Sequence, residues 1–162
     1  MLKAYKYRIY PNSEQRIQIA KTFGCCRFVY NQTLAYREEI YEKEKKSVSK
    51  TDCNNYCNRE LKKDYEWLKE IDKFAVSNAV FHLADAYDRF FKKQNHFPKF
   101  KSKRKSKKSY TTNFTNNNIL IGKNVIKLPK VGMVKAVIHK LPKDDWKLKS
   151  VTVSQDSVGN YF

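Results

Sequence analysis

Long apolar runs are absent from the sequence, and this absence excludes a helical membrane protein. A transmembrane helix needs roughly 20 consecutive apolar residues, and no run in the chain approaches that length. The first ten residues place lysine and arginine among tyrosines and contain no apolar signal-peptide segment. We therefore expect a soluble cytoplasmic protein that has no membrane partner.

A recognisable metal or disulfide framework is also missing. The four cysteines occur as an adjacent pair, Cys25-Cys26, and as Cys53-x3-Cys57. Neither arrangement completes a common zinc site, because no histidine pair lies nearby, and disulfides are rare in reducing compartments. We expect free thiols, two of them packing helices, and no metal or other cofactor in this chain.

Acidic residues are missing from one third of the chain. No carboxylate lies between Asp88 and Asp144, whereas the same stretch holds 16 of the 34 lysines and arginines and nearly all of the net charge of +18. Aromatic residues make up 14% of the chain, which is too much for a disordered polycation. Lysine and arginine neutralise phosphates and release counterions, so the charge indicates a nucleic-acid partner and a location at the nucleoid.

The basic residues are densest between residues 92 and 108. Phe97, Phe100 and Tyr110 lie among them and could stack on unpaired bases, or they could pin the basic segment to the core. A basic run alone could be a localisation signal, but further lysines after residue 120 favour an extended groove. The candidate phosphate contacts in the run are Lys99, Lys101, Lys103, Arg104, Lys105, Lys107 and Lys108.

Periodicity predicts one early strand, then helices. Residues 2–10 alternate in the manner of a strand, and Asn12 with Gln15 forms a helix-start signature. Residues 13–46 have helical spacing and predict two helices or one long bent helix, with Gly24 as a break or a close-packing point. A further helix is expected over residues 51–64, and a strongly amphipathic helix begins at Lys73.

After Tyr110 the pattern changes to short alternating runs. Residues 118–128 predict a hairpin, and residues 131–139, 148–154 and the end of the chain predict more strands. The fold class is therefore α+β, in which the first strand joins the late strands in a β-barrel or sheet and a helical domain is inserted between them.

Six segments together resemble one family, the TnpB (OrfB) insertion-sequence proteins. They are Leu2 to Asn12, Phe23-Gly-Cys-Cys-Arg-Phe-Val-Tyr-Asn31, Trp67-Leu-Lys-Glu-Ile-Asp72, Phe97-Pro-Lys-Phe-Lys101, Ser109 to Asn116 and Ile126-Lys-Leu-Pro-Lys130. Each is weak alone, but all six occur in the family's order and with roughly its spacing, so the resemblance covers the whole chain.

Members of this family are RNA-guided DNA endonucleases encoded by transposons. The resemblance implies a wedge-like β-barrel formed by the strand in residues 1–11 and by residues 110–162. It also implies a helical recognition domain over residues 12–94, described in the family as a helix-turn-helix, and a basic linker over residues 95–109. The implied partners are duplex DNA and a guide RNA derived from the transposon end.

The resemblance also implies which residues read the short DNA motif beside the target. Lys73, Phe74, Thr115 and Asn116 match the family's motif-reading positions, and Ser77 lies where some members have a longer amide. The residue types alone leave alternatives. Phe74 could belong to the core, and Asn116 could be a turn residue. Arg27 is expected to be structural or phosphate-facing.

No nuclease is expected in this chain. The family's RuvC-like domain holds magnesium with three carboxylates and carries a zinc ribbon, and its first catalytic aspartate would follow Phe162. Asp144, Asp145 and Asp156 lie in turn-like contexts. The chain is thus interpreted as a recognition fragment that does not cut DNA and that pairs with the nuclease domain or a second copy. The alternatives are a stand-alone DNA-binding regulator from the same family and an unrelated basic RNA-binding protein.

Overall fold

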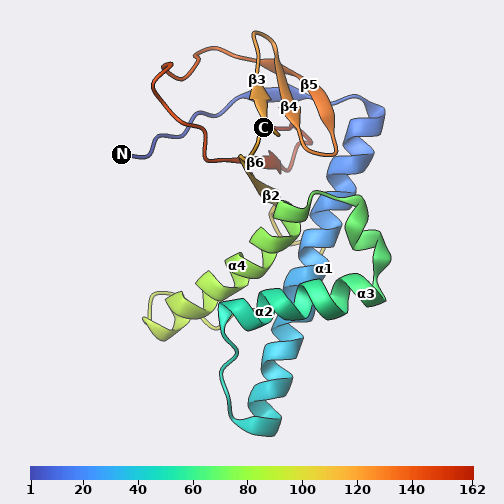
Figure 1. Ribbon diagram of the computed structural model, residues 1–162, viewed down its shortest axis with the longest axis vertical. Helices are drawn as coiled ribbons and strands as arrows, with labels where there is room; N and C mark the ends of the chain where they lie inside the picture. The colour runs from blue at the N-terminus through green and yellow to red at the C-terminus, as the bar shows by residue number, and fades with distance from the viewer.

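Helices and strands occupy opposite ends of an elongated molecule (Figure 1). The structure is a computed structural model that describes residues 1–162. The helices are α1 (Ser13–Glu44), α2 (Lys50–Tyr56), α3 (Lys62–Asp64) and α4 (Lys73–Phe91), with a π-helical turn over Cys57–Leu61 and a 3-10 turn over Glu66–Glu70. The strands are β1 (Arg8–Tyr10), β2 (Lys108–Asn113), β3 (Leu120–Ile121), β4 (Val125–Leu128), β5 (Gly132–Val137) and β6 (Ser150–Gln155).

Helix α1 connects the two ends of the molecule. It begins with the predicted capping box, in which the Asn12 and Gln15 side chains each accept a hydrogen bond from the other's backbone N–H at 2.9 Å. It ends at Lys45, which has a left-handed backbone. Of the two predicted forms, one long helix is correct, and the break expected at Gly24 is absent because buried side chains on both sides hold that turn in the helix.

Removal of the Asn12 cap should measurably destabilise the protein. The substitution Asn12→Ala leaves the Gln15 amide without its side-chain acceptor, and we expect a loss of about 1 kcal/mol in the free energy of unfolding. Urea denaturation followed by circular dichroism measures it. Ser13→Ala, in the first turn of the same helix, serves as the control and should change the unfolding free energy by less than about 0.5 kcal/mol.

The core of the helical end lies between α1, α2 and α4. Ile19 and Val29 of α1 and Val76 and Val80 of α4 are fully buried. All four cysteines are buried free thiols, as predicted, and burial raises the pKa of Cys26 to about 12. These thiols therefore act as small apolar packing groups rather than as nucleophiles or metal ligands.

The opening strand pairs with late strands, as predicted from the sequence. Strand β1 lies antiparallel to β5, with Ile9 opposite Ala136, in a sheet of order β1-β5-β4-β3. Strands β2 and β6 form a second antiparallel pair. Tyr161 bridges both Ile9 and Gln155, so the end of the chain joins the two sets of strands. The fold is therefore α+β.

A closed barrel is not found. Strand β3 lies at one edge of the strand order and β2 at the other, and no pairing connects them. Two further details differ from the sequence expectation. Only Arg8–Tyr10 is a strand, because residues 2–7 have no neighbouring strand to pair with, although Tyr7 is still buried. Strand β2 begins at Lys108, two residues inside the predicted linker, because Lys108 pairs with Gln155.

Candidate nucleic-acid interface

The basic segment between α4 and β2 folds back onto the helices. Phe97 contacts two α4 side chains edge to face, with ring centroids 5.4 Å from Tyr87 and 5.2 Å from Phe90. Pro98 beside it is buried, whereas Phe100 is 56% exposed. Phe97 therefore pins the basic segment to α4, although the residue is still 42% exposed, and Phe100 is more exposed than Phe97.

Asn31 on α1 fixes the middle of the basic segment. Its side chain donates a hydrogen bond to the Lys101 carbonyl at 2.8 Å and accepts one from the Lys101 amide at 2.7 Å. The Lys101 ammonium lies 4.2 Å from the centroid of the Tyr30 ring. Partial burial there lowers the pKa of Lys101, and burial together with the nearby Lys101 charge lowers the pKa of His82.

Loss of the Asn31 contacts should release the segment. Asn31→Ala removes two hydrogen bonds that contribute roughly 0.5–1 kcal/mol each, so the local opening equilibrium should shift by about 5- to 30-fold. Trypsin cleavage within residues 99–108 should become faster by the same factor, because cleavage tracks the open population. Gln32→Ala removes an amide from the same helix without touching the segment, and it should cleave at the wild-type rate.

Four predicted phosphate contacts meet at one cavity. Arg27, Lys101, Lys107 and Lys108 line it from α1, the basic segment and β2, and Tyr30, Ala79 and Tyr110 are among the apolar residues that line it with them. The volume is about 50 Å³. This exceeds the roughly 10–15 Å³ that one water needs by a comparable measure, so the cavity has room for small polar groups such as phosphate oxygens.

A second surface joins the start of α4 to the turn after β2. Asn78 donates to the Thr111 carbonyl at 2.8 Å and to the Asn113 side chain at 3.2 Å. Asn118 then donates to the Asn113 carbonyl and accepts from the Thr115 amide, both at 2.8 Å. These bonds connect the helix face that carries Lys73, Phe74 and Ser77 to the turn that carries Thr115 and Asn116.

The side chains on this second surface are accessible. Lys73, Thr115 and Asn116 are exposed, and Phe74 and Ser77 are half-buried. Asn116 has φ of 48°, so it is a left-handed turn residue and also presents its amide to solvent. The two interpretations of Asn116 are therefore compatible. Sequence reasoning expected Asn31 to be structural or phosphate-facing but could not name its partner, which lies 70 residues away. It missed Asn78, whose partner lies 33 residues away.

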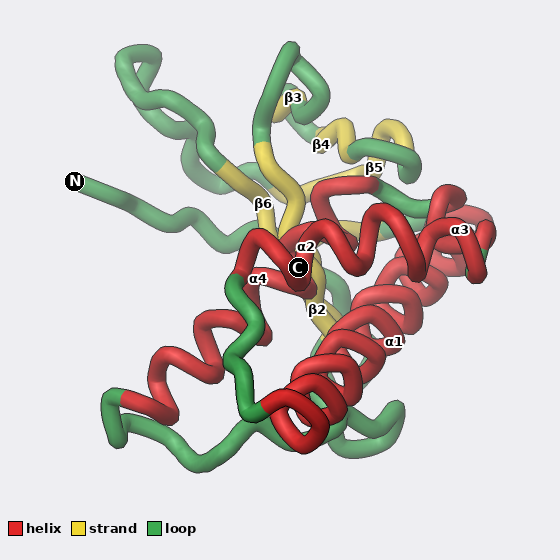
Figure 2. Tube along the Cα trace, turned by 60° about the horizontal axis from the view of Figure 1, so that its bottom comes forward, coloured by secondary structure: helices red, strands yellow, loops and turns green.

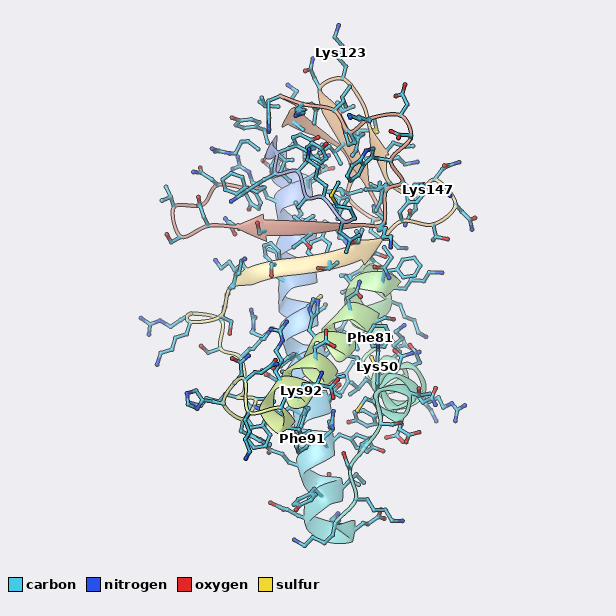
Figure 3. The ribbon with its side chains drawn as sticks, turned by 90° about the vertical axis from the view of Figure 1, so that its left-hand side faces the viewer. Lys50, Phe81, Phe91, Lys92, Lys123 and Lys147 are labelled. Atoms are coloured by element: carbon cyan, nitrogen blue, oxygen red, sulfur yellow. The ribbon has the colours of Figure 1, made fainter.

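The remaining cations are not gathered at the cavity. Lys99, Lys103, Arg104 and Lys105 are exposed along the basic segment, whereas Lys123 lies on the turn between β3 and β4 at the far tip of the molecule (Figure 3). None of the lysines and arginines between residues 89 and 143 forms an ion pair; the two ion pairs, Lys21–Glu70 and Lys43–Glu39, lie on the helices. The charge thus runs along the length of the molecule and is uncompensated.

Comparisons with known proteins show which family the sequence of this chain matches. Residues 1–46 match the helix-turn-helix domain of the OrfB proteins of IS605 elements. A candidate RNA-guided DNA endonuclease of Streptomyces pristinaespiralis is 31% identical over an alignment of 163 positions, and this alignment covers 99% of this chain. The chain belongs to the TnpB/OrfB family. It corresponds to the N-terminal part of such proteins.

Two further relatives cover less of the chain. The candidate RNA-guided DNA endonuclease InsQ of Escherichia coli K12 is 30% identical over 104 residues, or 63% of this chain. The virulence protein VsdF of Salmonella dublin is 34% identical over 113 residues, which are 64% of this chain and 95% of VsdF. The matches span 40% of the Streptomyces protein and 26% of InsQ.

The matched helix-turn-helix region has a simple form in this TnpB/OrfB chain, since residues 1–46 consist of β1 and the single helix α1. No group of three His, Cys, Asp or Glu side chains is arranged to hold a metal ion. No helix combines the length and the apolar character that a membrane span requires.

Proposed function

We propose that this chain binds nucleic acid as the recognition part of a TnpB-like, transposon-encoded RNA-guided DNA endonuclease. The observation that carries the proposal is the cavity at which Arg27, Lys101, Lys107 and Lys108 meet without any carboxylate partner. Unpaired cations at a concave site attract phosphate and gain free energy from counterion release. The partners are duplex DNA and a guide RNA.

The second surface is proposed to read the DNA motif beside the target. Lys73 begins α4, where the positive end of the helix favours a phosphate. Thr115 and Asn116 offer donors and acceptors to base edges, and Phe74 and Ser77 face the same region. Asn78 bonds to the end of β2, and Asn118 ties the following turn to Asn113, which would fix the spacing between the two groups of contacts.

The open strand order also bears on the proposal. Strands β2 and β3 leave two edges without a neighbouring strand, and such edges tend to recruit further strands. We propose that the nuclease domain of the full-length protein, or a second copy of this chain, adds strands there and completes a wedge-like barrel. The metal-dependent cleavage is assigned to that nuclease domain.

Binding that depends strongly on salt tests the proposal. Fluorescence anisotropy with a labelled 30-base-pair duplex, and separately with the transposon-end RNA, should give affinities that fall by roughly 10³-fold between 50 and 200 mM salt if six phosphates are contacted. Absence of binding at 50 mM salt contradicts the proposal, and so does an affinity that is the same at 50 and 200 mM salt. Lys123→Gln removes one positive charge at the tip far from the cavity. It serves as the control for the effect of a single charge on binding.

A stand-alone DNA-binding regulator is the second candidate. It is favoured by one observation: the match with VsdF covers 95% of that protein, so a protein of this kind can consist almost entirely of the region shared with this chain. A regulator would bind a duplex without guide RNA. Tight duplex binding that is unchanged by added RNA supports the regulator, whereas duplex binding that requires RNA supports the endonuclease part.

A further inference from the structure

A cleft of about 500 Å³ lies beside the basic cavity, between α1 and the 3-10 turn. The connection from α3 to α4 passes over the first half of α1 (Figures 1 and 2), and the Glu70 carbonyl accepts a hydrogen bond from Gln18 at 3.0 Å. The residues lining the cleft include Lys21, Gly24, Arg27, Phe28, Asn31 and Trp67. Its volume is within the range of ligand pockets and is ten times that of the basic cavity.

Trp67 gives the cleft an accessible aromatic surface. Its ring is held edge to face against Phe28, with centroids 4.8 Å apart, and against Tyr65 at 5.7 Å. It nevertheless stays 41% exposed. A tryptophan that is fixed on its edges but open to solvent is suited to stacking against a planar ligand, because its orientation is already set.

Arg27 connects the cleft to the phosphate cavity. It lines both spaces, and its guanidinium folds over Gly24, where a Cβ atom would lie 3.7 Å from Nη2. On the same edge, Asn31 holds the backbone of Lys101. A ligand in the cleft therefore lies next to Arg27, and beyond Arg27 the basic cavity holds further cations that can bind a negatively charged group of the ligand.

We propose that the cleft binds one unpaired nucleobase of a single-stranded nucleic acid, with the adjoining phosphate on Arg27 and Lys101. The inference deepens the proposed function and rests on it. A base fits better than an apolar peptide, because Arg27 in the lining has no carboxylate partner, whereas Lys21 is paired with Glu70 at 3.5 Å within the same cleft. Stacking on Trp67 would favour any base, since every base has an aromatic face.

Tryptophan fluorescence tests this directly, because the chain has only two tryptophans, Trp67 and Trp146. In the Trp146→Phe variant, Trp67 is the sole emitter. Titration with a 12-nucleotide single-stranded DNA should quench its emission, whereas the same backbone with abasic sites should bind and leave it unquenched. Replacing Trp67 by Leu should lower affinity for the base-containing strand by about 5- to 100-fold and leave affinity for the abasic strand unchanged.

The readouts separate this inference from the proposed function. If both strands bind by anisotropy but Trp67 is not quenched, or if Trp67→Leu binds both as well as wild type, the cleft is no base site and nucleic-acid binding still stands. If neither strand nor duplex binds, the proposed function fails with it. Trp67→Tyr keeps an aromatic ring and should retain most of the affinity. Trp67 emission that changes with protein concentration alone would assign the cleft to a second copy and overturn the inference.

Discussion

Replacing Arg27, Lys107 and Lys108 together by glutamine is expected to lower affinity for duplex DNA by roughly 10²- to 10³-fold at 0.1 M salt. The three side chains converge on one cavity without ion-pair partners. Log affinity changes by about 0.9 per phosphate contact per decade of salt, so each lost contact costs roughly eightfold at 0.1 M. The slope of log affinity against log salt should become shallower by roughly 2.7.

The control for this variant removes the same number of charges elsewhere. Lys46 follows the end of α1, Lys123 lies at the strand tip and Lys147 precedes β6 (Figure 3). The triple substitution of these lysines by glutamine should lower affinity by less than about tenfold, because only long-range attraction changes. Equal losses in the two triple variants would mean that total charge matters and that the cavity does not.

Leu34→Ala should cost about 2–5 kcal/mol in the free energy of unfolding. Leu34 is fully buried in a small cluster with Tyr30, Leu83 and Tyr87 that joins α1 to α4. Truncation leaves a cavity between two helices whose positions are also fixed by the rest of the core. The Arg37 guanidinium lies 3.6 Å from the centroid of the Tyr87 ring in this cluster. The end of α4 should therefore become less tightly packed as well.

Two matched variants show whether the loss comes from the cavity. Leu34→Met keeps most of the volume and should cost less than about 1.5 kcal/mol. Ile17→Ala removes a large side chain from the same helix at a position that is 60% exposed, and it should stay within about 0.5 kcal/mol of wild type. Urea unfolding curves compare all three. A loss in Ile17→Ala equal to that in Leu34→Ala would mean that burial of Leu34 does not set the cost.

Local features were predictable because their causes lie within a few residues. The cap at Asn12, the connection after Lys45 and the amphipathic helix that starts at Lys73 each depend on neighbours three or four positions away. The hairpin of β3 and β4 likewise follows from alternation around a short turn. Of the two roles considered for Gly24, the break was wrong, because propensity is a weak prior that burial on both sides of the turn overrides.

Long-range features depended on which surfaces meet. Nothing near Asn31 or Asn78 in sequence indicates that Asn31 holds Lys101 and that Asn78 holds strand β2. The cleft beside Trp67 arises only where the connection from α3 to α4 crosses α1. The closed barrel was expected from strand order, but pairing of the last edges requires a matching partner strand, and β2 and β3 do not supply one to each other.

The sequence by itself determined that this chain is basic, α+β and a member of the TnpB/OrfB type, since charge, periodicity and motifs are properties of the linear chain. Only the tertiary structure decided which cations act together. Arg27 and Lys108 are about half the chain apart, and they share a cavity because packing of α1, α4 and β2 brings them there. Electrostatic attraction depends on distance in space, so the position of the binding site is a consequence of that packing.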